Sequence, residues 1–197
     1  GKTLLRVSHL RQQAISQLLA NRILKAVKAA LPTTDILIFS DFNYGCLPQP
    51  LVDEIVDACK SLKVLMVADS QSSSQVGDVS RFKDMMLLTP TEREARLSVG
   101  DFNSGLVVLT EKLRKKARAQ NIMVTLGAEG LLAHAAIQSD DQWPTDRLPA
   151  FNAAPRDSAG AGDSLLACCS MSLAVGADIW QSMYLGSIAN DIEQQAS

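Results

Sequence analysis

The sequence predicts an α/β fold in which a mostly parallel sheet carries helices on both faces. Short, wholly apolar runs recur along the chain, and such runs are typical of strands buried inside a parallel sheet. They alternate with segments of helical periodicity, which favours parallel strands joined by helical crossovers. A glycine-rich turn, residues 157–163 (DSAGAGD), then leads directly into an apolar helical segment. In sheets of this kind a ligand binds beyond the carboxyl ends of the strands.

Each predicted strand is a short apolar run bounded by polar residues. Because every side chain in the run is apolar, we expect both faces of these strands to be buried. Residues 131–137 are expected to pair near the last of them, and residues 142–152 to form a loop with an edge strand. The predicted buried strands are residues 36–39, 64–67, 85–88 and 122–124.

The helices are predicted from apolar periodicity and from the residues that end them. Pro32 ends an apolar stripe that begins at Ile15, and Gly100 ends a helix that begins at Thr91. The predicted helices are residues 15–31, 50–62, 91–99, most of 105–120, and most of the last third of the chain.

Composition and charge argue against several classes of function. The chain has 197 residues and a formal net charge of -2, which gives no reason to expect a nucleic-acid partner. No apolar stretch is long enough to span a bilayer, and no signal peptide is visible. The four cysteines show no CxxC spacing and there are two histidines, so we expect no zinc site. We therefore expect a reduced, cytoplasmic protein that binds neither nucleic acid nor membrane.

The glycine-rich turn is the feature that points most directly to chemistry. Its glycines allow close approach of the backbone, and the start of the following helix offers unpaired N–H groups and a positive dipole end to an anion. Asp163 lies beside this anion site, where a carboxylate makes sense if it takes a proton from an alcohol. The pattern thus suggests phosphoryl transfer to a hydroxyl group. A structural interpretation also stands, because an acid in the first turn of a helix is favourable in itself.

Polar residues follow the predicted strands at one edge of the sheet. Asp41, Asp69, Thr89 and Thr125 each come at the end of an apolar run, and we expect the start of the glycine-rich helix to join them. Capping of local backbone groups is an equally good interpretation of Asp41 and Asp69.

Taken together, these motifs resemble those of the ribokinase-like (PfkB) carbohydrate kinases, in particular the heptose-phosphate kinase branch. Residues 157–163 match the D-T-x-G-A-G-D signature, with Ser158 in place of Thr. Residues 124–130 (VTLGAEG) match V-T-x-G-x-x-G, and residues 89–94 (TPTERE) match T-P-N-x-x-E. Residues 40–45 (SDFNYG) occupy the place of an S-D-Y-x-K-G segment. The resemblance implies a ribokinase-like three-layer α/β/α domain.

The resemblance also implies a role for each motif. Asp163 would be the catalytic base, and the backbone N–H groups of residues 160–162 would form the anion hole for the transferred phosphoryl group. Glu94 would help to organise Mg²⁺ through water. The implied site residues are Asp163, Gly160, Ala161 and Gly162 for catalysis, Thr125, Gly127, Gly130 and Asn190 for the nucleotide, Asp41 and Asp157 near the substrate or phosphate, and Glu94 for Mg²⁺.

The resemblance covers nearly all of the chain but only the latter part of the family's length. Residues 1–10 are interpreted as the remnant of a lid strand, and residues 11–197 as the nucleotide-binding and catalytic domain, with the lid and first strands largely absent. We therefore expect a fragment of a longer protein, in which paired lids would allow a homodimer.

The expected function is ATP- and Mg²⁺-dependent phosphoryl transfer to a hydroxyl of a sugar or sugar phosphate. Thr91 replaces the Asn of the magnesium element, Tyr44 replaces a Lys of the heptose kinases, and residues 69–71 (DSQ) replace the commoner D-P-K or D-P-N. These departures favour one alternative, a non-catalytic nucleotide- or sugar-binding member of the fold. A nucleoside kinase with a different acceptor pocket is a second alternative.

Overall fold

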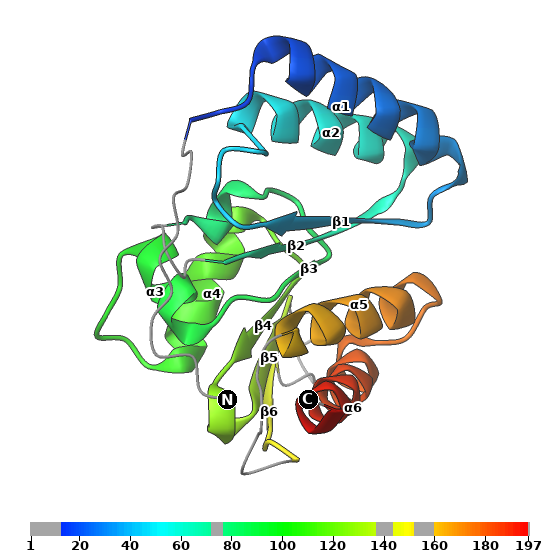
Figure 1. Ribbon diagram of the computed structural model, residues 1–197. Coiled ribbons are helices and arrows are strands. Elements are labelled where there is room, and N and C mark those ends of the chain that lie inside the picture. Colours follow the sequence, from blue (N-terminus) through cyan, green and yellow to red (C-terminus); the bar gives the residue numbers. More distant parts are fainter. Residues whose placement is uncertain (1–12, 72–76, 137–143, 152–159, 197) are drawn as a thin grey trace.

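The computed structural model describes residues 13–71, 77–136, 144–151 and 160–196. The predicted lid strand, residues 1–10, and Asp157 lie outside these residues. Within them, six strands form a single sheet whose spatial order follows the sequence (Figure 1). The strands are β1 Ile36–Asp41, β2 Leu65–Ser70, β3 Leu87–Leu88, β4 Asn121–Thr125, β5 Leu131–Ala135 and β6 Thr145–Leu148.

The first four strands are parallel, as the alternating pattern predicted, and the last two are antiparallel additions. Helices and short 3-10 turns connect them, and the parallel connections carry helices α2, α3 and α4. The helices are α1 Gln17–Ala30, α2 Gln49–Leu62, α3 Glu92–Val99, α4 Leu106–Ala117, α5 Ala161–Ala174 and α6 Ile179–Ala196, and the 3-10 turns are η1 Leu31–Thr33, η2 Val79–Arg81 and η3 Gly127–Glu129.

Two apolar cores lie on the two faces of the sheet. Because side chains alternate along a strand, Val67 faces one core whereas its neighbours Met66 and Ala68 face the other. Helices α2 and α4 cover the first face, with α1 against α2 and α3 against α4, and α5 and α6 cover the second face (Figure 1). The three-layer α/β/α arrangement is therefore confirmed.

The expectation that the first strand is buried on both faces is wrong. Strand β1 is the edge of the described sheet, and Ile38 is 41 % exposed whereas Phe39, on the opposite face, is 3 % exposed. The third predicted strand is also shorter than expected, because β3 contains only Leu87 and Leu88. Across the part of the chain that the structure describes, no helix is both long and apolar enough to cross a membrane.

Candidate active site

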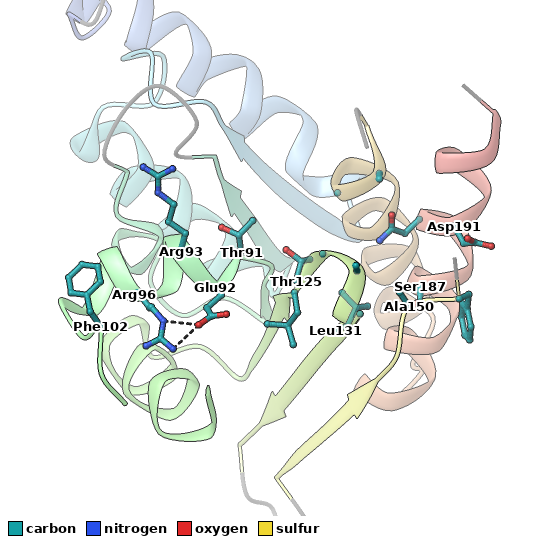
Figure 2. A pocket seen from close by; sticks show the side chains of 18 residues that line it. Thr91, Glu92, Arg93, Arg96, Phe102, Thr125, Leu131, Ala150, Ser187 and Asp191 are labelled. Atoms are coloured by element: carbon teal, nitrogen blue, oxygen red, sulfur yellow. Dashed lines mark hydrogen bonds and ion pairs between the residues drawn. The ribbon is translucent and has the colours of Figure 1, made fainter. Parts of the chain in front are cut away.

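Two adjoining cavities lie at the carboxyl edge of the parallel strands, where helix α5 begins. The larger cavity encloses about 740 Å³ and the smaller about 340 Å³. The larger volume is in the range typical of small-molecule sites. Thr91, Arg93, Thr125 and Gly162 line both cavities, so the two share one wall. Figure 2 shows Thr91, Arg93 and Thr125 among the residues that line the larger cavity.

The start of α5 forms part of this shared wall and has the properties of an anion site. Gly160 is the N-cap with φ +82°, a left-handed conformation that favours glycine, and no side chain caps the helix. Gly162 is different, because its φ is not positive and a Cβ built there would meet nothing within 4 Å. Neither backbone conformation nor packing therefore requires glycine at position 162. Asp163 follows directly, exposed in the first turn.

Three carboxyl groups come together below this helix start. Asp69, at the end of β2, is only 8 % exposed. Burial, together with the negative charges of Glu94 and Asp163, raises the pKa of Asp69 to about 7. Asp69, Thr89 and Thr125 all line the smaller cavity with Gly162, which confirms for these three strand-end residues that they meet the glycine-rich turn at one edge.

Glu94 is held in place by the first turn of α3. Its Oε2 atom accepts hydrogen bonds from the backbone N–H and the Oγ1 hydroxyl of Thr91, both at 2.8 Å. The Thr91 hydroxyl in turn accepts from the N–H of Glu94, which completes a capping box. Thr91, which stands where the motif T-P-N-x-x-E has Asn, thus orients the acid of the same motif.

The acids of the smaller cavity suit a Mg²⁺ ion that arrives with phosphate. The described residues contain no group of three or more His, Cys, Asp or Glu side chains able to hold a metal ion alone. Mg²⁺, however, keeps several waters and is usually bound through one or two carboxylates plus the phosphates of a substrate. Glu94 and Asp69 fit that requirement.

The turn between β4 and β5 shapes the floor of the larger cavity. The N–H of Leu126 donates to the carbonyl of Gly130 at 2.8 Å, which closes the turn. Gly130 has φ +92°, and a Cβ there would lie 2.1 Å from the carbonyl oxygen of Leu148 on β6. Glycine is therefore required at position 130 by both conformation and close approach. Thr125, Gly127 and Gly130, the residues predicted for the nucleotide, all line this cavity.

The opposite wall comes from α6 and from the segment after β6. Asn190, predicted from a late helix, lines the larger cavity beside Ser187 and Asp191. Phe151 lines it as well and packs edge-on against Tyr184, with ring centroids 5.6 Å apart. The sequence reasoning missed Phe151, because an isolated aromatic residue in a loop carries no motif signal.

Comparison with known proteins decides the family. Residues 11–189 match the family described as pfkB family carbohydrate kinase. The chain belongs to the pfkB carbohydrate kinase family. Two relatives named Bifunctional protein HldE are similar to it, one from Desulfatibacillum aliphaticivorans (28 % identical over 195 residues, 98 % of this chain and 38 % of the relative) and one from Helicobacter hepaticus (28 % over 193 residues, 96 % and 38 %). The chain thus spans about two fifths of the length of these curated relatives.

Solved structures share the fold of this pfkB chain. A phosphofructokinase-2 mutant from Escherichia coli matches with a TM-score of 0.75 at 16 % identity, covering 93 % of this chain and 58 % of that protein. Ribokinase from Arabidopsis thaliana, complexed with ribose and ATP, matches with a TM-score of 0.66 at 16 % identity, covering 93 % and 54 %. The ribokinase-like fold expected from the sequence is confirmed.

Asp41, predicted near the substrate, lies outside the described walls of both cavities of the pfkB domain. It is 4 % exposed, and its Oδ2 atom accepts a hydrogen bond from Nη2 of Arg81 at 2.8 Å. Its Oδ1 accepts from the N–H of Asn43 at 3.0 Å, and Arg81 also donates to the carbonyl of Leu47. These contacts tie the loop after β1 to η2, which agrees with the capping interpretation of this acid.

Proposed function

We propose that this domain transfers the terminal phosphoryl group of ATP to a hydroxyl of a sugar or sugar phosphate. The observation that carries the proposal is the start of α5, where glycine at 162 serves no structural purpose and Asp163 stands beside the wall shared by two cavities. Because Gly162 has no side chain and faces open space, a phosphoryl group can approach the N–H groups at the start of the helix closely. The family match and the relative solved with ribose and ATP support the substrate class.

In this proposal the nucleotide occupies the larger cavity, and the acceptor approaches from the smaller one. Thr125, Gly127, Gly130 and Asn190 surround the nucleotide. Asp163 accepts the proton of the acceptor hydroxyl as that oxygen attacks the terminal phosphorus in line, the bond from that phosphorus to the bridging oxygen breaks, and ADP leaves. The N–H groups of residues 160–162 stabilise charge on the transferring oxygens, because phosphoryl transfer depends mainly on positioning and electrostatics.

Glu94 and Asp69 would hold Mg²⁺, Glu94 through water. When bound, Mg²⁺ neutralises charge on the phosphates during transfer. Thr91 keeps the Glu94 carboxylate oriented in the capping box. This support for the acid favours a catalytic domain over the non-catalytic alternative that the replacement of Asn by Thr91 suggested. A homodimer through residues 1–10 and a cytoplasmic location stay predictions.

The replacement Asp163→Asn in the full-length protein tests this proposal. It keeps the size of the side chain but removes the proton acceptor, so we expect turnover to fall by a factor on the order of a hundred or more while ATP still binds. Asp57→Asn makes the same change of charge on the exposed face of α2 and serves as the matched control. Near-normal turnover of the Asp163 variant would show that this residue is not the base.

A further inference from the structure

Arg93 occupies the wall that the two cavities share, and the sequence motifs assign it no role. It is exposed in the first turn of α3, directly after Glu92 and before Glu94. In Figure 2 its side chain points away from the pair formed by Glu92 and Arg96. Because Arg93 lines both cavities, it lies on the wall where the two proposed substrates would meet.

The guanidinium group of Arg93 makes no hydrogen bond or ion pair with any residue that the structure describes. The neighbouring Arg96, which lines only the larger cavity, is fully engaged. It bonds Oε1 of Glu92 at 2.7 and 2.8 Å and the carbonyls of Asp101 and Ser104 at 3.3 and 3.1 Å. Arg96 thus stabilises α3 and the segment that follows it, whereas the N–H donors of Arg93 stay available for a ligand.

The position of Arg93 is also electrostatically unfavourable for folding. A cation in the first turn of a helix opposes the positive end of the helix dipole. Since no described acid offsets this cost by pairing with it, packing and local stability give no reason for arginine here. A ligand that carries negative charge would supply one.

The surrounding charges strengthen this argument. Asp69 and Glu94 line the smaller cavity, Asp163 contributes a further negative charge, and Arg93 is the single cation along the described part of its wall. A phosphate entering these surroundings is repelled by the acids. A guanidinium group offers a planar pair of N–H donors that matches phosphate oxygens.

We propose that Arg93 is a phosphate-binding residue that contacts a phosphate oxyanion at the junction of the two cavities. This inference rests on the proposed function, because it presumes that phosphate-bearing ligands occupy these cavities. Two ligands carry such a phosphate, namely the nucleotide through its terminal phosphate and an acceptor that is already phosphorylated. An unpaired guanidinium group can bind either phosphate.

The test compares equilibrium binding to the full-length wild-type protein and three variants by isothermal titration calorimetry. The ligands are Mg-ATP, Mg-ADP, adenosine, and a phosphorylated and an unphosphorylated sugar. Arg93→Ala removes the cation, Arg93→Lys keeps the charge without the planar fork, and Arg22→Ala is the matched control. Arg22 is an exposed arginine on α1 that also has no partner among the described residues.

We expect Arg93→Ala to weaken binding of one phosphate-bearing ligand by about ten- to a hundredfold. Adenosine and the unphosphorylated sugar should bind as they do to the wild type, and Arg93→Lys should restore part of the loss. A loss for Mg-ATP but not Mg-ADP identifies the terminal phosphate, and a loss confined to the phosphorylated sugar identifies the acceptor. The midpoint of thermal unfolding should stay unchanged or rise, because a cation leaves the helix start.

Two results would contradict the proposal in different ways. If the wild type transfers phosphate while Arg93→Ala binds every ligand as the wild type and Arg22→Ala do, the role of Arg93 is overturned and the kinase assignment stands. If the wild type binds none of the phosphate-bearing ligands, the proposed function and the role of Arg93 fall together.

Discussion

The buried carboxyl group of Asp69 predicts a measurable dependence of stability on pH. Burial and the nearby charges of Glu94 and Asp163 raise its pKa from the ordinary 3.8 to about 7. The folded protein therefore holds this proton up to about pH 7, whereas the unfolded chain releases it near pH 4. Because the unfolded state binds fewer protons in this interval, the free energy of unfolding falls as the pH rises through it.

The size of the effect follows from the difference between the two pKa values. A pKa difference of roughly three corresponds to about 4 kcal/mol in the free energy of unfolding. About 2.5 kcal/mol of this stabilisation is lost between pH 5 and pH 8. Asp69→Asn removes the ionisation while keeping the shape of the side chain. We expect the variant to gain about 2.5 kcal/mol relative to the wild type when the pH is raised from 5 to 8.

Urea denaturation at pH 5 and pH 8, without Mg²⁺ or nucleotide, measures this change. Each stability is compared with that of the wild type at the same pH, so that the other titrating groups cancel. Asp57→Asn, which alters an exposed acid on α2, should show no such change. A difference between Asp69→Asn and the wild type that stays the same at the two pH values would refute the reasoning.

Two further predictions concern the glycine-rich turn and the capping box. Gly162→Ala should leave the free energy of unfolding unchanged or raise it by up to about 1 kcal/mol, because alanine is the better helix former and its Cβ meets open space, yet turnover should fall at least about tenfold. Unfolding curves and steady-state kinetics measure the two effects, and unimpaired turnover would show that the absence of a side chain at position 162 does not serve catalysis. Thr91→Ala should lower the free energy of unfolding by about 1 kcal/mol, because it removes the N-cap, and should raise the Mg²⁺ concentration needed for half-maximal turnover, whereas Thr91→Asn should do neither. Equal behaviour of the two variants in both measurements would mean that the capping box does not orient Glu94.

The sequence predicted those parts of the fold that local patterns encode. The apolar runs located the strands, and Gly100, which has φ +69° at the end of α3, was recognised from its position after a helical stripe. The site motifs were recognisable because glycines at 127, 130 and 160 serve conformations that few other residues adopt. These features depend on a few neighbouring residues, which is why a single sequence is enough.

Other features depend on contacts between distant segments and could not be predicted. The exposure of Ile38 follows from β1 being the edge of the described sheet, which no local pattern shows. Asp41 was predicted near the substrate, and its ion pair with Arg81, forty residues later, is a contact that the sequence does not show. Arg93 has no role in the sequence motifs, and only the structure shows that it lines both cavities.

The most direct test of the central claim is release of ADP by the full-length protein, given Mg-ATP and a panel of sugars, sugar phosphates and nucleosides. The account predicts ADP release that depends on a sugar or sugar phosphate, with the phosphate recovered on a hydroxyl of that acceptor. Binding of ATP without transfer to any acceptor would contradict it and favour the non-catalytic alternative. Release that depends on a nucleoside alone would contradict the proposed acceptor class.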